Sequence, residues 1–481
     1  MPRPPFRAFN LISDPIHGYI ELTKRLGAEE AAEFGLGPED AAEEDLLDTA
    51  WLQRLRRISQ LQSARWVFPT AEHSRFTHGL GVMHEAGLWA RHLYPSLRTE
   101  LLRRDPGAVP PSEGLVVETL RVAGLVHDVG HGPFAHFFDD HVLAAFPAPV
   151  DPRRPAGKPL THEDLSQLIV LRELGPLIGR LRRAPGLSPE RDAFARDEAV
   201  DPAWVAFLVS KPPLDDPAMP AWVRLLQPLL SGVFTVDNLD YVRRDAYMTG
   251  VAIGPVDVER LRRYCYVGPR GLTVYEPGVA ALDMFLTARL FMYQQVYLHR
   301  TVRAIDLDLK QVFGPSVRAI AGDRSPADEL EAYADLDEYA LLHQAAMWSR
   351  GEALAEAPVP GDGRVPSAIG KVWEGILLRR PRWRSEFEVR REYSGEEPAG
   401  AVAELTEGVT DPIGEPGVAP VVVDMSTIDA RPYDGPQAER YLAIETRDGR
   451  AMTVERALAR LPAKVLVGRR YRRVDGGERT L

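Results

Sequence analysis

Leu125-Val-His-Asp-Val-Gly-His-Gly-Pro-Phe-Ala-His136 is the stretch of this sequence that decides the fold. It sets His127 beside Asp128 at the end of an apolar helical run, and two glycines and a proline then turn the chain. Adjacent side chains on a helix diverge by about 100°, but at a helix end they can converge on one ion. An imidazole with a carboxylate suits Mn, Fe, Mg, Co, Ni or Zn. Because such a pair alone more often caps a helix or a turn, its meaning depends on other segments.

The apolar spacing around this stretch predicts a mainly helical core. Leu47, Trp51, Leu55, Ile58 and Leu61 recur at three- and four-residue steps, which predicts one amphipathic helix over 41–62. The same reasoning predicts further helices near 78–92, 118–127, 161–174, 222–247 and 280–321.

The composition of the chain changes after Gly351. Residues 394–420 are rich in Gly, Pro and Glu, which marks loops. Val421-Val-Val and the runs 441–446 and 451–454, which flank Asp448-Gly449, predict strands with a hairpin. We therefore predict a mainly α fold, with a helical core over residues 1–350 and a smaller α+β portion over 351–481.

Composition and charge narrow the classes of function. Hydrophobic residues make up 45% and charged residues 26% of the chain, and no apolar run is long enough for a membrane span or a signal peptide. We therefore expect no membrane partner. Cys265 is the only cysteine, so we also expect a cytoplasmic protein without an internal disulfide. The net charge of −11 argues against non-specific nucleic-acid binding by the whole surface, so a phosphate-rich substrate needs a local cluster of Arg and Lys.

Two further segments accompany the His-Asp pair in a recognisable order. Upstream stands Glu72-His-Ser-Arg-Phe-Thr-His78, and downstream stands Thr235-Val-Asp-Asn-Leu-Asp-Tyr-Val-Arg-Arg-Asp245. With them the sequence resembles the HD-type deoxynucleoside triphosphate triphosphohydrolases, a family that includes dGTPases and the SAM-and-HD-domain enzyme of animals. The resemblance runs from about Asp14 to Asp306 and also rests on Asp14-Pro-Ile-His-Gly, Gln53-Arg-Leu-Arg-Arg-Ile-Ser-Gln-Leu, Val67-Phe-Pro, Thr161-His-Glu and Val296-Tyr-Leu-His-Arg. The family fold is a helical HD core, which agrees with the periodicity.

The resemblance implies a divalent metal ion, with Mn, Fe, Mg, Co, Ni and Zn all open. Its implied ligands are His78, His127, Asp128 and Asp237. Four protein ligands leave positions on an octahedral ion for a water and a phosphate oxygen, and a metal lowers the pKa of such a water. Hydrolysis at the α-phosphate would release a deoxynucleoside and intact inorganic triphosphate.

Three histidines and a carboxylate are the candidate proton-transfer groups. His131 and His136 follow His127 closely, and Asp139 stands three residues after His136, a helical spacing that lets carboxylate and imidazole meet. That contact would orient His136 as a general acid for the departing 5′-oxygen, although a structural hydrogen bond at a helix end explains it as well. His162 follows Thr161, a good N-cap, at a helix start that favours anions. In similar enzymes the matching residues are catalytic.

The resemblance also implies the residues that bind a deoxynucleoside triphosphate. Arg75 and Arg289 match residues that contact the triphosphate, although each could be a surface cation. Tyr297 matches a tyrosine that packs where a ribose 2′-hydroxyl would stand, although a lone tyrosine is more often core. The remaining sugar-side positions are matched by Gln60, Leu61, Tyr241 and Asp245.

Assembly and regulation follow from the resemblance as further expectations. The animal enzyme forms a homotetramer with guanine-nucleotide activators, and Asp48, Gln53 and Arg56 match its guanine-reading residues. Asn10 replaces an expected lysine, and residues 272–283 lack the basic residues used around the second nucleotide. Asn238 stands where the animal enzyme has a lysine, and Tyr293 stands near a family histidine, so the phosphate contacts differ.

Two other classes of function stay open. One is an HD phosphohydrolase or phosphodiesterase that acts on another nucleotide or on nucleic acid. The other is a nucleotide-sensing or single-strand nucleic-acid-binding module, based on the basic runs Arg379-Arg-Pro-Arg-Trp-Arg384 and Arg469-Arg-Tyr-Arg-Arg473. A solvated face or an oligomer contact explains the same runs, and the acidic net charge favours that explanation.

Overall fold

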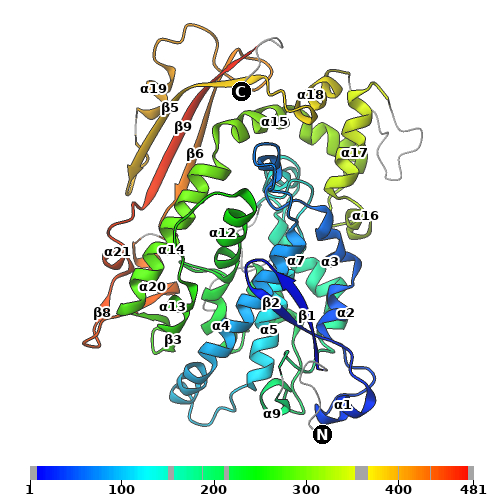
Figure 1. Ribbon diagram of the computed structural model, residues 1–481, viewed down its shortest axis with the longest axis vertical. Helices are drawn as coiled ribbons and strands as arrows, with labels where there is room; N and C mark the ends of the chain where they lie inside the picture. The colour runs from blue at the N-terminus through cyan, green and yellow to red at the C-terminus, as the bar shows by residue number, and fades with distance from the viewer. Residues whose placement is uncertain are drawn as a thin grey trace.

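The computed structural model is mainly helical, as the spacing predicts (Figure 1). It describes residues 8–149, 157–186, 188–210, 216–352, 367–398, 400–433 and 435–474. Before residue 351 the α-helices are α1 (Ala28–Glu33), α2 (Glu43–Leu47), α3 (Ala50–Arg54), α4 (Arg75–Arg104), α5 (Glu113–Val126), α6 (His136–His141), α7 (His162–Ile169), α8 (Gly175–Ile178), α9 (Pro189–Asp192), α10 (Pro202–Ser210), α11 (Ala221–Leu226), α12 (Val236–Thr249), α13 (Val258–Arg263), α14 (Val279–Met292), α15 (Arg300–Ala321), α16 (Leu330–Ala334) and α17 (Glu338–Ser349). After it come α18 (Ser367–Leu377), α19 (Ala401–Thr406), α20 (Ala438–Tyr441) and α21 (Val454–Ala457).

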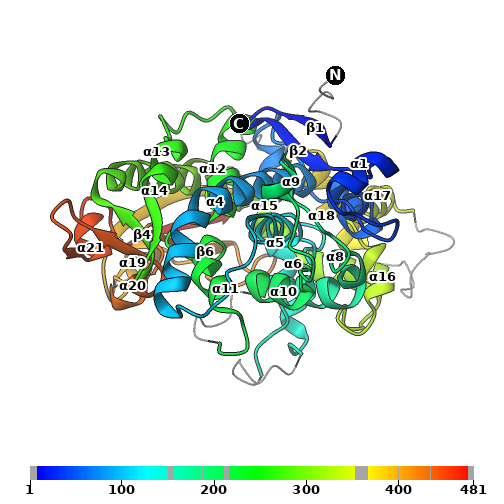
Figure 2. The same cartoon turned by 90° about the horizontal axis from the view of Figure 1, so that it is seen from below.

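Helix α5 lies in the middle of the helical body and ends at the decisive stretch (Figure 2). Ser112 caps its first turn by accepting a hydrogen bond from the Leu115 N–H at 3.2 Å. All residues from Gly114 to Val126 are buried, because helices such as α4 and α10 pack around it. A helix enclosed in this way holds His127 and Asp128, which follow it directly, in fixed positions.

Helix α12 begins and ends with strong local signals. Thr235 accepts a hydrogen bond from the Asn238 N–H at 3.1 Å, and Gly250 ends the helix in the left-handed conformation at φ +73°. Asp237 therefore stands in the first turn of a well-defined helix, opposite α4.

Three of the predicted helices are wrong as single helices. The segment 41–62 forms α2, α3 and the 3-10 turn η2 (Leu55–Arg57), because Thr49 caps a new helix by accepting from the Leu52 N–H. The segment 222–247 divides into α11, the 3-10 turn η6 (Gln227–Leu229) and α12, because Thr235 starts a new helix. The segment 280–321 divides at the π-helical turn η8 (Tyr293–Tyr297), and His299 caps α15.

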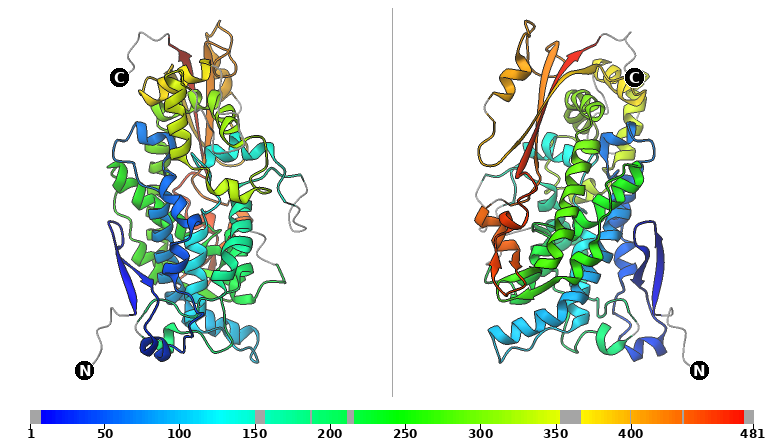
Figure 3. Two further views of the ribbon diagram at one scale, coloured as in Figure 1. Left: turned by 90° about the vertical axis from the view of Figure 1, so that its right-hand side faces the viewer. Right: turned by 60° about the vertical axis from the view of Figure 1, so that its left-hand side comes forward.

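Within the described residues, three small sheets accompany the helices. Strands β1 (Phe9–Asp14) and β2 (Gly18–Thr23) form a hairpin on the flank of the body, whereas β5 (Trp383–Tyr393), β9 (Lys464–Arg473) and β6 (Val421–Asp429) pair in that order at another end (Figure 3). The third sheet has the order β3 (Cys265–Gly268), β4 (Gly271–Tyr275), β7 (Ala443–Glu445) and β8 (Ala451–Met452). The predicted strand at 421–423 and the hairpin around Asp448-Gly449 are confirmed.

The C-terminal portion packs against the helical body. Strand β7 pairs in parallel with β4, so residues after 351 complete a sheet that begins before it. On β6, the Asp424 carboxylate accepts hydrogen bonds from the Arg303 guanidinium on α15 at 2.8 and 2.6 Å. The boundary at 351 stays a prediction.

Candidate active site

Four side chains from three helical segments converge at the predicted metal centre. His78 comes from α4, His127 and Asp128 follow α5, and Asp237 comes from α12. Asp237 Oδ1 lies 3.1 Å from His78 Nε2 and 3.8 Å from His127 Nε2, and His127 Nε2 lies 3.2 Å from Asp128 Oδ1. The structure thus brings all four predicted ligands together.

The outer nitrogen of each histidine is fixed by a hydrogen bond. His127 Nδ1 donates to the Gly124 carbonyl at 2.8 Å, and its buried Nε2 has no hydrogen-bond partner among the described residues. His78 Nδ1 donates to Asp240 Oδ2 at 2.8 Å. Both rings therefore present Nε2 to the centre, which is the arrangement of metal-binding histidines with outer partners. An unpartnered buried nitrogen beside two carboxylates fits a divalent cation.

The carboxylates of this centre favour a positive charge between them. Burial alone lowers the pKa of His78, but hydrogen bonds to Asp237 and Asp240 raise it to about 10. Burial also lowers the pKa of His127, and the neighbouring Asp128 only partly offsets this effect. A proton on His78 satisfies the carboxylates, and a metal ion would do so more fully.

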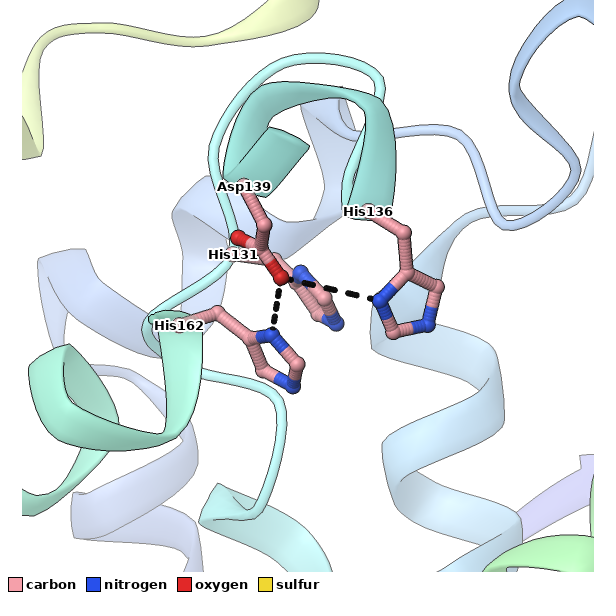
Figure 4. A group of neighbouring side chains, drawn as sticks. All are labelled: His131, His136, Asp139 and His162. Carbon is pink, nitrogen blue, oxygen red and sulfur yellow. Dashed lines mark hydrogen bonds and ion pairs between the residues drawn. The ribbon is translucent and has the colours of Figure 1, made fainter. Parts of the chain in front are cut away.

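The predicted proton-transfer residues form a second cluster next to the first (Figure 4). His131 and His162 stack with ring centroids 3.7 Å apart and planes inclined by 17°. Asp139 accepts a hydrogen bond from His162 Nδ1, whereas its Oδ2 lies 3.6 Å from His136 Nδ1. The structure thus brings Asp139 close to His136, as the spacing predicts, and adds His162 at the start of α7 as a closer partner.

The two stacked rings have opposite tendencies to hold a proton. Burial alone lowers the pKa of His162, but Glu163 and Asp139 raise it above its ordinary value. Burial, Arg75 and His162 lower the pKa of His131 far below the usual range, and neither ring nitrogen of His131 has a hydrogen-bond partner among the described residues. Neighbouring groups with opposite pKa shifts are typical of catalytic sites.

Arg75 connects the two clusters. Its guanidinium donates to Asp128 Oδ2, and Asp128 Oδ1 lies 3.4 Å from His131 Nε2. Arg75 also lines a neighbouring cavity. A buried guanidinium beside a metal ligand is well placed to bind a phosphate.

A cavity of about 280 Å³ adjoins these clusters. It is lined by most of the predicted substrate residues together with His136, namely Gln60, Leu61, Arg75, Tyr241, Asp245 and Tyr297. Tyr297 donates its hydroxyl to Asp245 Oδ2 at 2.6 Å, and His73 Nε2 donates to Asp245 Oδ1 at 2.8 Å. The side-chain oxygen of Gln60 is buried without a partner among the described residues.

Arg289 is the predicted substrate residue that does not line this cavity. Its guanidinium donates to the Asp429 carbonyl at 2.7 Å and to the Tyr241 hydroxyl at 3.2 Å, and it lies 4.9 Å from the centre of the Tyr293 ring. Arg289 therefore supports the cavity wall formed by Tyr241 and Tyr293.

The residues of the expected regulatory site lie at the surface around α3. Asp48 and Arg56 are exposed and Gln53 is half-buried. Arg56 donates to the Gln53 side chain at 2.8 Å, and its guanidinium lies 3.7 Å from the centre of the Phe76 ring. Gln53 and Arg56 thus adjoin, and the guanine-nucleotide site stays a prediction.

Sequence reasoning missed a layer of residues behind the ligands. Asp240 contacts His78, His17 and Arg244, and His73 holds Asp245. The quoted motifs contained these residues, but their roles depend on contacts between distant segments.

Comparison with protein families identifies the class. The model of the HD domain matches residues 75–183, and that of the HD-associated region matches residues 256–353. These segments carry α4, α5, the His-Asp pair and the helices behind the cavity. The chain therefore carries an HD domain followed by an HD-associated region, and its His/Asp centre is one that could hold the divalent metal ion of an HD-type phosphohydrolase.

Individual relatives are more distant. The chain is 27% identical over 361 residues to an uncharacterized protein, YwfO, of Bacillus subtilis, which covers 71% of this chain and 67% of that protein. It is 28% identical over 372 residues to deoxynucleoside triphosphate triphosphohydrolase SAMHD1 of Danio rerio, covering 73% of this chain and 53% of that protein. For SAMHD1 of Homo sapiens the identity is 29% over 363 residues, or 69% and 50% of the chains. The match thus spans about half the length of these SAMHD1 proteins.

Solved structures share the fold over nearly the whole chain. A hypothetical protein from Aquifex aeolicus has a TM-score of 0.64 and 22% identity, with 97% of this chain and 96% of that chain covered. A phosphohydrolase from Bacteroides thetaiotaomicron has a TM-score of 0.61 and 21% identity, with 97% and 100% covered. In the part of the chain that the structure describes, no helix combines the length and apolar character needed to cross a membrane.

Proposed function

We propose that this chain hydrolyses deoxynucleoside triphosphates to a deoxynucleoside and inorganic triphosphate. The observation that carries the proposal is the cavity lined by Gln60, Tyr241 and Tyr297 beside the metal centre. The cavity is also lined by Arg75, which donates to the candidate ligand Asp128, and by His136, which belongs to the histidine cluster. The SAMHD1 relatives, whose name states this activity, support the same reading.

Different residues of the cavity would bind different parts of the nucleotide. Arg75 would bind the phosphates, and the aromatic wall of Tyr241 and Tyr297 would contact the sugar. Because Tyr297 is held by Asp245, its ring cannot easily turn away to admit a 2′-hydroxyl. A ribonucleotide would therefore fit less well than a deoxynucleotide.

The histidine cluster would protonate the leaving group and stabilise the negative charge that develops on the α-phosphate. The pKa of His162 is raised, so it can place a positive charge near the α-phosphate. His136 lines the cavity and is exposed on its side chain, so it can donate a proton to the departing 5′-oxygen. A divalent metal held by His78, His127, Asp128 and Asp237 would supply an activated water and polarise the phosphate.

The experiment is an incubation of purified protein with each dNTP and each NTP in the presence of Mg²⁺ or Mn²⁺, with chromatographic separation of the products. We expect inorganic triphosphate and deoxynucleoside. Release of inorganic phosphate would indicate another HD phosphohydrolase activity, and turnover of NTPs alone would contradict the role of Tyr297. Cleavage of a nucleotide polymer instead would indicate a phosphodiesterase.

Assembly and regulation belong to this proposal as well. By resemblance, we propose a cytoplasmic homotetramer with a regulatory guanine nucleotide near Asp48, Gln53 and Arg56. Added GTP should then change both the molar mass in light scattering and the rate of dNTP hydrolysis. If GTP changes neither, the regulatory site is wrong and the hydrolase proposal is unaffected.

The structure gives little support to the nucleic-acid-binding alternative. In the second basic run, Arg469 is paired with Glu388 at 2.6 Å, and Arg472 is paired with Glu386 at 2.8 Å and Asp411 at 2.7 Å. These charges are therefore partly neutralised within the C-terminal sheet. Salt-dependent binding of labelled single-stranded DNA would test the alternative, because phosphate contacts weaken steeply with ionic strength.

A further inference from the structure

The turn that closes the β1–β2 hairpin has a rigid internal structure. Asp14 Oδ1 accepts hydrogen bonds from the N–H groups of Ile16 and His17 at 2.9 and 3.0 Å. Gly18 ends the turn at φ +75°, a conformation that glycine adopts readily. The turn therefore presents the side chains of Asp14 and His17 in fixed directions.

Both side chains reach into the helical core and end at α12. His17 Nε2 donates to Asp240 Oδ1 at 2.7 Å, and Asp14 Oδ2 accepts from Arg244 Nη1 at 2.7 Å. The side chains of His17 and Asp240 are 3% and 0% exposed, so water does not compete for this contact. A buried hydrogen bond to a carboxylate in such surroundings is strong.

Asp240 carries the contact onward to the metal centre. Arg244 donates to both of its oxygens at 2.8 Å, and Oδ2 also accepts from His78 Nδ1 at 2.8 Å. The carboxylate is thus held from three sides. It can hold the His78 ring in one orientation and keep the proton on Nδ1, which leaves Nε2 to face His127 and Asp237.

The helix that carries His78 is shaped for this contact. Gly81 stands one turn after His78, and a Cβ atom there would overlap Asp240 and the Arg244 guanidinium. The close approach of α4 and α12 at this point therefore needs a glycine.

We propose that Asp14, His17 and Asp240 are positioning residues of the metal centre, which set its affinity for a divalent metal through the orientation of His78. The inference rests on the proposed metal centre. It also gives a function to the Asp14-Pro-Ile-His-Gly motif, which contacts neither the cavity nor the ligands. Outer partners of metal ligands typically change metal affinity by about 10–100-fold.

The first experiment compares the wild type with Asp240→Asn, which keeps the shape but removes the negative charge. Metal-free protein is titrated with Mn²⁺, and free Mn²⁺ is followed by its electron paramagnetic resonance signal. We expect the Kd of Asp240→Asn to rise about 10–100-fold. Asp308→Asn is the matched control, because Asp308 is also buried and paired with an arginine, Arg382 at 3.0 Å, but lies away from the centre. Its Kd should equal that of the wild type.

The second experiment substitutes His17. His17→Ala removes the donor to Asp240 and should weaken Mn²⁺ binding, whereas His17→Gln keeps a donor and should retain most of the affinity. Thermal unfolding of each metal-free variant separates loss of structure from loss of positioning. These variants test the proposal even if Asp240→Asn does not fold.

The possible outcomes are distinct. Wild-type affinity in folded Asp240→Asn or in folded His17→Ala would overturn the proposal, as would an equal loss in Asp308→Asn. A wild type that binds no Mn²⁺ or other divalent ion would instead overturn the metal centre, and the positioning role would fall with it.

Discussion

Asp139 hydrogen-bonds to His162 Nδ1 and lies 3.6 Å from His136 Nδ1, so one carboxylate serves two imidazoles. The hydrogen bonds to these rings and the charge of His162 outweigh burial and hold the pKa of Asp139 well below its ordinary value. Asp139 is therefore ionised at neutral pH. The protonated forms of His136 and His162 therefore both depend on the Asp139 carboxylate.

Asp139→Asn should slow turnover strongly without loss of metal. Because the carboxylate that supports the charge of His162 is removed, we expect kcat to fall about 100–1,000-fold, as for loss of acid–base assistance. Steady-state kinetics with a dNTP and elemental analysis measure the two effects. The neighbouring exposed Asp140 provides the control, and Asp140→Asn should leave kcat unchanged. Equal rates for Asp139→Asn and the wild type would mean that the cluster has no catalytic part.

Removal of the metal should abolish turnover. Asp237→Ala deletes the carboxylate that lies 3.1 Å from His78 Nε2, so the protein should purify without metal and without dNTP hydrolysis. A chelator should have the same effect on the wild type, and added Mn²⁺ should restore activity only there. Asp323→Ala, at an 85% exposed side chain, is the control. Retained activity in Asp237→Ala would show that the site has been misplaced.

The convergence of the four candidate metal ligands could be predicted because each lies within a local motif. His127 and Asp128 adjoin in sequence, and the resemblance to a family supplied His78 and Asp237. The layer behind them could not be found in this way, because His17 and Asp240 are 223 residues apart. Only the packing of the β1–β2 hairpin against the helices brings the two together.

The helices show the same limit in their boundaries. Apolar spacing correctly predicted helical segments, but it continued through Asp48-Thr49 although Thr49 starts a new helix. Apolar residues recur wherever a segment faces the core. Two short helices that face the same core can therefore continue one apolar pattern across the break between them. The spacing within α6 correctly predicted the approach of Asp139 to His136, but it could not predict the closer contact with His162, since the position of His162 depends on how α7 packs.

The proposed contact of Tyr297 with the sugar predicts that its removal changes the preference between dNTP and NTP. Tyr297→Ala should open the space beside the sugar, and the ratio of kcat/KM for dNTP over NTP should fall about 10–100-fold. Tyr297→Phe keeps the ring but loses the 2.6 Å hydrogen bond to Asp245 that holds it, so its ratio should lie between those of the wild type and Tyr297→Ala. Product chromatography with matched dATP and ATP measures both. An unchanged ratio in Tyr297→Ala would remove the sugar-side role of this residue.

The contact between Arg303 and Asp424 predicts how stability depends on pH. Burial alone would raise the pKa of Asp424, but the Arg303 guanidinium lowers it below its ordinary value. The ion pair therefore stabilises the protein above about pH 4, where the unfolded carboxyl is also ionised, and the contribution is lost as the pH falls through the lower folded pKa. Asp424→Asn should cost about 3 kcal/mol at pH 7, as for breaking a buried pair.

Urea unfolding at several pH values measures this difference. The gap in unfolding free energy between the wild type and Asp424→Asn should be constant from pH 7 to about pH 5 and should shrink below about pH 4. There the Asp424 carboxyl of the unfolded chain takes up a proton, whereas the native carboxylate does so only at its lower pKa. Asp448, which pairs with Arg450 at the surface, is the matched control. Asp448→Asn should leave the free energy of unfolding nearly unchanged, since exposed pairs contribute little. If the two substitutions have equal effects, burial against α15 does not strengthen the Arg303–Asp424 contact, and the attachment of the C-terminal sheet must depend on its apolar contacts instead.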